Sequence, residues 1–361
     1  MKKIGREVLF LPINERVKRN GEGAFIRLKD GRIMYGYTEY GNSGGDHDWA
    51  QLVAVYSSDE GETWADRRVL LRPNQQDANI MSVSFLRMLN GDLGMFFLRK
   101  RNGHCRLYLI RSADEGLTWY GETVCCDEGY YVVNNDRVIR LKNGNILFPA
   151  NLHVRPDSSY SAQCIFCSED DGKNWKKLGE PLYHPFPNST TGLQESGIFQ
   201  FEDETLWAWA RTRSGSQFMM YSQDGGSAWT TPCGSELFTG PDSPMQVKQA
   251  GPVTVAIFNP KPRYCGRLEL ERAETGKQLW ARTPFICLAS RDGGKTFPEG
   301  YLLEDDPANA YCYPAVFQGD TYFLVAYYHS NDSGTCLSSC KLTKVMYEEL
   351  DGSYQVKNCI P

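Results

Sequence analysis

The sequence of 361 residues predicts an all-β protein that folds as one six-bladed β-propeller. Three observations lead to this prediction. A short turn motif recurs five times along the chain, strand-like runs precede its copies, and no segment has clear helical periodicity. The composition, with 41% hydrophobic and 12% aromatic residues, provides enough apolar material for a large core and argues against disorder.

The recurring motif is Ser-x-Asp-x-Gly-x-x-Trp. Its copies are Ser57–Trp64, Ser112–Trp119, Ser168–Trp175, Ser222–Trp229 and, with Phe in place of Trp, Ser290–Phe297. The first four recur roughly every 55 residues and the last follows a longer gap, a period that suits one four-stranded blade per repeat. This regularity excludes chance repetition.

The chemistry of the motif is that of a hairpin turn. Alternating or apolar runs such as 52–56 and 106–110 precede it, as expected of strands. Ser and Asp side chains bond nearby backbone amides, Gly supplies a positive φ, and the aromatic ring packs back onto the blade. We interpret the five motif aspartates as structural, because a catalytic group is needed once whereas these recur from blade to blade.

Five motif copies account for five blades, and the remaining strands supply a sixth. Hairpin signals lie between the copies, for example Asp30-Gly31 and Asn143-Gly144. The motif-free stretch from 311 onward contains the strand-like run 321–328, and 8–10 at the other end of the chain is expected to close the ring beside it. No linker marks a second domain, so we expect residues 1–361 to form a single domain.

Charge and hydropathy exclude several classes of partner. The net charge is -5 and the longest basic run is 99–101, so the concentrated basic surface that nucleic-acid binding needs is missing. No apolar stretch is long enough to span a bilayer. Arg6 and Glu7 interrupt the N-terminal segment before the apolar core of a signal peptide could form. We therefore expect a cytoplasmic protein with no nucleic-acid partner and no membrane span.

Twelve cysteines suggest a disulfide framework at first sight, but in a reducing compartment they stay thiols. Cys164 and Cys167 have the spacing of a metal knuckle, yet on a strand their sulfurs would point to opposite faces. We interpret both as core thiols. The five histidines show no metal-ligand spacing, and the sequence predicts no metal and no cofactor.

The recurring Ser-x-Asp-x-Gly-x-x-Trp turn is the motif known as the Asp box. Asp boxes at this spacing on an all-β chain resemble the sialidase (neuraminidase) superfamily, and the resemblance covers nearly the whole chain. The box also occurs in proteins without sialidase activity, so the single-copy residues between boxes carry more weight. The resemblance implies three arginines that hold the sugar carboxylate, an aspartate acid/base, and a tyrosine nucleophile paired with a glutamate.

The strongest match is the stretch 192–199 followed by 206–211, which resembles the family's glutamate strand and second arginine and identifies Glu195 and Arg211. The stretch 19–31 looks like the first-arginine strand and identifies Arg19, although the Pro that usually follows this arginine is absent. Ahead of the fifth box, 282–289 resembles the third-arginine strand and identifies Arg282. Its rivals are Arg263, Arg267 and Arg272.

The remaining candidates come from two short segments. Asp46 and Asp48 precede the first box, as the acid/base aspartate does in sialidases; we favour Asp46, and the sequence does not decide between them. The stretch 310–316 resembles the nucleophile strand, where Tyr313 fits better than Tyr311 by its distance to the following strand.

These residue types suit the chemistry that the resemblance implies. Sialic acid carries a carboxylate on its anomeric carbon, which arginine forks bind bidentately. That carboxylate would repel an acidic nucleophile, and sialidases use tyrosine instead. The predicted partner is a sialylated or other acidic-sugar glycan, and the predicted activity is retaining exo-hydrolysis without a metal. The alternatives are a propeller glycosidase for another terminal sugar and a non-catalytic glycan-binding propeller.

Overall fold

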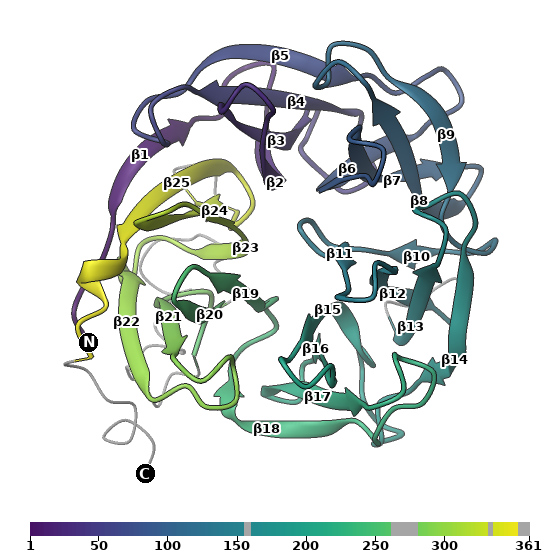
Figure 1. The fold of residues 1–361 in the computed structure, drawn as a ribbon, viewed down its shortest axis with the longest axis vertical. Coiled ribbons are helices and arrows are strands. Elements are labelled where there is room, and N and C mark those ends of the chain that lie inside the picture. The colour runs from purple at the N-terminus through teal and green to yellow at the C-terminus, as the bar shows by residue number, and fades with distance from the viewer. Residues whose placement is uncertain (155–159, 261–280, 331–334, 353–361) are drawn as a thin grey trace.

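The computed structural model describes residues 1–154, 160–260, 281–330 and 335–352. Six antiparallel sheets are arranged as blades around a central axis (Figure 1), which confirms the predicted all-β, six-bladed propeller. The described part of the chain has one short helical element, the 3-10 helix η2 (Tyr347–Glu349). None of its helices is long and apolar enough to cross a membrane.

The strands of each blade are given from the innermost strand outward. The first blade contains β2 (Arg19–Arg27), β3 (Ile33–Tyr40), β4 (Ala50–Ser57) and β5 (Ala65–Leu71), and the second contains β6 (Asn79–Arg87), β7 (Leu93–Arg101), β8 (His104–Ser112) and β9 (Tyr120–Val124). The third contains β10 (Tyr131–Val132) and β11 (Ile139–Arg140), both paired with β12 (Ile146–His153), then β13 (Ser161–Ser168) and β14 (Lys176–Leu182), and the fourth contains β15 (Gln194–Gln200), β16 (Leu206–Arg211), β17 (Ser216–Ser222) and β18 (Cys233–Thr239). The fifth contains β19 (Gln246–Ala250), β20 (Val253–Phe258), β21 (Phe285–Ser290) and β22 (Glu299–Glu304), and the sixth contains β23 (Tyr311–Gln318), β24 (Tyr322–His329), β25 (Ser339–Met346) and β1 (Arg6–Leu11).

Segments from both ends of the chain build the sixth blade. Strand β1 pairs antiparallel with β25, with Phe10 opposite Lys341, and forms the outer edge of the sheet. The prediction that 8–10 closes the ring is confirmed. This pairing fastens the first blade to the last, so the ring has no gap.

The hydrophobic core lies between neighbouring blades. Of six clusters of buried side chains, five combine residues from two adjacent blades, and the one between the second and third blades also includes Tyr40 and Ala50 of the first. The middle strands contribute to the cluster on either side. Strand β3, for example, directs Met34 toward the second blade and Tyr35 toward the sixth. Because both faces of these strands are buried, their sequences are almost continuously apolar.

The five Asp-box copies form the turns that the sequence predicts. In the first copy the Ser57 hydroxyl donates to Asp59 at 2.8 Å and accepts the Gly61 backbone N–H at 2.8 Å. Asp59 in turn accepts the backbone N–H of Thr63 at 2.9 Å. The other four copies repeat this Ser–Asp and Ser–Gly bonding. The motif aspartates are committed to their own turns.

Cys164 and Cys167 lie on opposite faces of β13. Cys164 packs between the second and third blades, and Cys167 packs between the third and fourth. Both are buried free thiols, which confirms that they are core residues. Within the described ranges, no group of three or more His, Cys, Asp or Glu side chains is placed to hold a metal ion.

Candidate active site

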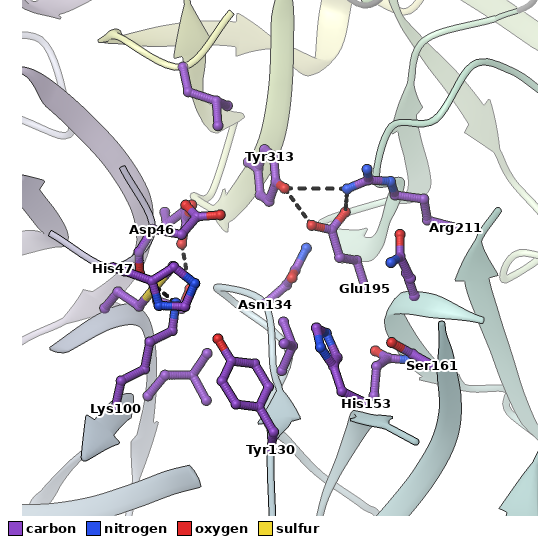
Figure 2. A pocket seen from close by; sticks show the side chains of 18 of the residues that line it. Asp46, His47, Lys100, Tyr130, Asn134, His153, Ser161, Glu195, Arg211 and Tyr313 are labelled. Carbon is purple, nitrogen blue, oxygen red and sulfur yellow. Dashed lines mark hydrogen bonds and ion pairs between the residues drawn. The ribbon is translucent and has the colours of Figure 1, made fainter. Parts of the chain in front are cut away.

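A cavity of about 420 Å³ lies on the propeller axis. Residues from all six blades line it, among them Asp46 from the first, Lys100 from the second, Glu195 and Arg211 from the fourth, and Tyr313 from the sixth. Figure 2 shows Asp46, His47 and Lys100 on one side of the cavity and Glu195, Arg211 and Tyr313 on the other. None of the five Asp-box aspartates lines the cavity.

A repeated backbone irregularity aims side chains at this cavity. The innermost strands β2, β6, β15 and β23 each contain a β-bulge. Within each bulge one residue other than glycine has a positive φ, between 45° and 57°: these are Glu22, Ser82, Glu195 and Tyr313. All four line the cavity. Bulges re-aim side chains, and left-handed backbone at non-glycine residues concentrates at functional sites.

Tyr313, Glu195 and Arg211 form a triangle of hydrogen bonds (Figure 2). The Tyr313 hydroxyl donates to Glu195 Oε1, Arg211 Nη1 donates to Glu195 Oε2, and Arg211 Nη1 lies 3.4 Å from the Tyr313 hydroxyl. Burial, with the adjacent carboxylate of Glu195, raises the pKa of Tyr313 well above its usual value. The resting phenol is therefore protonated, and its proton is bonded to a carboxylate that can accept it.

Asp242 holds Arg211 from the other side. It accepts a hydrogen bond from Arg211 Nε with one oxygen and from Arg213 Nε, at 2.7 Å, with the other. Burial opposes the charged form of Asp242, but the hydrogen bonds and charges of Arg211, Arg213 and Arg282 together outweigh burial and lower the pKa of the carboxyl to about 2. Arg211 is thus fixed between Asp242 and Glu195.

This pairing predicts a pH-dependent loss of stability. The stabilisation from Asp242 is complete above the unfolded pKa, near 3.9, and disappears as the pH falls toward the folded pKa of about 2. Asp242→Asn should lose up to about 2 kcal/mol of unfolding free energy at pH 6 and approach wild type near pH 2. Urea unfolding at several pH values measures this, with Asp320→Asn as the control for a lost surface charge. If the unfolding free energies of wild type and Asp242→Asn changed in parallel with pH, this prediction would be contradicted.

Arg19 is buried behind the cavity wall rather than on it, with a side chain only 2% exposed. Its guanidinium donates to Tyr328 at 2.6 Å, to Glu22 and to Asp46. The predicted first arginine thus lies beside the cavity, with two carboxylates in front of it. Burial, opposed by Arg19, raises the pKa of Glu22.

The two candidate aspartates occupy different positions. Asp46 lines the cavity with 57% of its side chain exposed, and the charge of Arg19 lowers its pKa to about 2. Asp48 does not line the cavity; it accepts bonds from Ser43 and from the backbone N–H of Gly45 and thereby caps its own loop. The geometry therefore favours Asp46, a choice that the sequence left open.

Arg282 lines the cavity from the fifth blade and is 3% exposed. Its guanidinium lies 5.6 Å from the centre of the Tyr313 ring. Arg282 Nη2 donates to the backbone oxygen of Asp242 at 3.0 Å, which places it next to Arg211. The three rival arginines at 263, 267 and 272 lie outside the described residues.

Several residues on the cavity wall or bonded to it escaped prediction. Lys100 is buried on β7, and its ammonium donates to the backbone oxygen of Asp46. The signal was present, because Lys100 belongs to a basic run that continues an apolar strand. Glu22 and Asp242 carried no recognisable motif. Asn134 and His153 also line the cavity, whereas His104 does not.

Comparisons with known proteins agree with this architecture. A sialidase from Clostridium perfringens is 22% identical over 249 residues, which span 61% of this chain and 63% of that protein. The leech intramolecular trans-sialidase superposes with a TM-score of 0.71 at 13% identity, covering 98% of this chain and 71% of that one. The intramolecular trans-sialidase of Ruminococcus gnavus gives 0.69 at 14% identity, covering 93% and 96%.

A protein of unknown function from Dyadobacter fermentans has a similar fold, with a TM-score of 0.72 at 17% identity over 94% of this chain and 99% of its own. At such identities the solved structures establish the shared propeller alone. The model of the BNR repeat-like domain matches residues 41–325, which include all five Asp boxes. The chain therefore belongs to the BNR repeat-like domain family.

Proposed function

We propose that the protein is an exo-acting, retaining glycosidase that releases a terminal sialic acid or a related nonulosonic acid from a glycan. The observation that carries the proposal is the triangle of Tyr313, Glu195 and Arg211 on the cavity wall. A tyrosine whose proton is bonded to a carboxylate is an activated nucleophile. Arg211 and Arg282, both on the wall, supply positive charge for the substrate carboxylate.

In the first step the Tyr313 oxygen attacks the anomeric carbon while Glu195 accepts the phenol proton. The glycosidic bond breaks, its electron pair goes to the leaving oxygen, and Asp46 protonates that oxygen. In the second step Asp46 takes a proton from water, which attacks the anomeric carbon, and the departing Tyr313 recovers its proton from Glu195. Two displacements at one carbon retain its configuration.

The low pKa of Asp46 imposes a condition on the first step. Paired with Arg19, Asp46 is ionised at neutral pH and holds no proton to give. Asp46 must therefore take up a proton from solvent before the leaving oxygen is protonated, and separation from Arg19 on substrate binding favours that uptake because it removes the charge that lowers the pKa of Asp46. Glu22, on the other side of Arg19, is placed to keep that guanidinium paired when Asp46 moves.

Proton NMR of a reaction with an aryl α-sialoside tests the proposed function directly. We expect release of free sugar by the wild type, with the α anomer appearing before mutarotation. Initial appearance of the β anomer would contradict retention. If the protein hydrolyses neither this sialoside nor other acidic-sugar glycosides, the proposal as a whole is contradicted.

Asp46→Asn should separate the two steps by leaving group. A sugar hydroxyl is a poor leaving group that needs protonation by Asp46, so turnover of a sialyl-lactose should fall by about 100-fold or more. An aryl leaving group needs little protonation, so a fluorogenic sialoside should show a rapid burst and then slow hydrolysis of the covalent intermediate. Stopped-flow fluorescence measures the burst. Asp48→Asn is the matched control and should behave as wild type; equal losses for the two variants would contradict the assignment.

A second candidate, a retaining glycosidase for another terminal sugar, is favoured by the position of Arg19. Glu22 and Asp46 lie between this arginine and the cavity, so among the described residues the wall has two arginines rather than three for a substrate carboxylate. A panel of aryl glycosides separates the candidates. Turnover of a neutral sugar without turnover of the sialoside would select the second, and glycan binding without turnover would select a binding propeller.

A further inference from the structure

Two cysteines flank the arginine on the cavity wall. Cys312 immediately precedes Tyr313 on β23, and Cys336 lies before β25 and lines the cavity. Arg282 Nη1 donates to both sulfurs, at 3.2 Å to Cys312 Sγ and 3.4 Å to Cys336 Sγ. A single guanidinium nitrogen thus brings two thiols together beside the proposed nucleophile.

This environment differs from that of the other buried cysteines. Burial raises the pKa of Cys105, Cys287 and Cys340, as expected of thiols in apolar cores. At Cys336 the hydrogen bond from Cys312 and the charge of Arg282 outweigh burial and lower the pKa to about 6. Burial raises the pKa of Cys312, which therefore stays a thiol and acts as the donor. A thiolate at Cys336 has two donors that stabilise it.

We propose that Cys336 is a site of covalent modification inside the candidate active site, where its sulfur attacks small soft electrophiles such as haloacetamides and hydroperoxides. With iodoacetamide the sulfur electron pair forms a C–S bond to the methylene carbon and iodide leaves with the C–I pair. With hydrogen peroxide the sulfur attacks one oxygen, the O–O bond breaks, hydroxide leaves, and a sulfenic acid forms.

Access and consequence both follow from the cavity. Cys336 lies on its wall, so a reagent of a few atoms can reach the sulfur, whereas Cys312 is fully buried and does not line the cavity. An adduct on Cys336 would occupy space next to Arg282 and Tyr313. Modification should block any ligand that uses this wall; for catalysis, that consequence rests on the proposed function.

The test is competitive labelling of the intact protein with iodoacetamide, followed by peptide mass spectrometry, between pH 5 and pH 9. Cys336 should react with a midpoint near pH 6, whereas N-acetylcysteine in the same tube should follow an ordinary thiol, near pH 8.5. At pH 6.5 we expect Cys336 to be labelled at least about 10-fold more completely than the exposed Cys233. A Cys336 midpoint at or above that of N-acetylcysteine would overturn the proposal.

Two variants test whether Arg282 and Cys312 are the cause of the low reaction midpoint of Cys336. Arg282→Gln should move the Cys336 midpoint toward that of an ordinary thiol, and Cys312→Ala should move it in the same direction. Cys287→Ala, in the core between the fifth and sixth blades, is the control and should leave the midpoint unchanged. An unchanged midpoint in both Arg282→Gln and Cys312→Ala would overturn the proposed origin of the reactivity.

Hydrogen peroxide with dimedone, which captures sulfenic acids, should label Cys336 before any other cysteine; preferential labelling elsewhere would overturn the oxidation. If the protein hydrolyses sialosides, loss of activity should match the fraction of Cys336 modified, and Cys336→Ala should keep its own untreated rate under the reagent. The labelling measurements need no turnover, so failure of the proposed function leaves them decisive.

Discussion

Tyr313→Phe should reduce kcat by about a thousandfold or more, because it removes the phenol oxygen that bonds to the anomeric carbon in the proposed mechanism. KM should change little, since the phenyl ring keeps its packing against Tyr328. Glu195 would keep its bond to Arg211, so the fold of the site should survive. Initial rates on a fluorogenic α-sialoside and thermal unfolding of the same preparations measure both expectations.

Tyr311→Phe is the matched control, because Tyr311 lies two residues away on the same strand. Its ring packs in the core between the fifth and sixth blades and does not line the cavity. We expect a small loss of stability and nearly unchanged kcat. A Tyr313→Phe enzyme that retained more than about a tenth of wild-type kcat would exclude the phenol as nucleophile.

Arg211→Ala should reduce kcat/KM by at least about a thousandfold, equivalent to about 4 kcal/mol of lost transition-state stabilisation. Two effects combine: the proposed substrate carboxylate loses an arginine partner, and Glu195 loses the guanidinium that neutralises it, whereas Asp242 keeps only Arg213. Arg211→Lys should recover part of the charge but not the fork, so we expect an intermediate rate.

Arg213→Ala provides the control for Arg211. Arg213 binds the same carboxylate of Asp242, but its side chain is 52% exposed and does not line the cavity. Its loss should change kcat/KM by less than about threefold. Similar losses in the two arginine variants would mean that Arg211 acts only through Asp242 and not on the substrate.

The architecture could be predicted because its signal is local and repeated. Every Asp box carries its own turn chemistry within eight residues, so Ser57, Asp59 and Gly61 fix one hairpin without help from distant residues. The continuously apolar middle strands follow from burial on both faces. Ring closure by β1 required only that the sixth blade lacked a strand.

The site was predictable only where motifs were specific. Tyr313, Glu195 and Arg211 were identified in separate strands, and the structure brings them into contact. Glu22 was missed because a bulge breaks the alternation of side chains from which strand faces are inferred. Asp242 was missed because it lies 31 residues from Arg211, and no periodicity connects a loop carboxylate to a strand arginine across that separation.

Because four innermost strands each carry a bulge, the side chain that each of these four blades presents to the propeller axis can change one blade at a time. At each bulge the backbone has already taken the left-handed turn, so replacing Ser82 changes the side chain that faces the axis and removes the hydrogen bond that Ser82 donates to Glu22. We expect variation at the positions of Glu22 and Ser82 to follow substrate choice, whereas the outer Asp boxes remain indifferent to it.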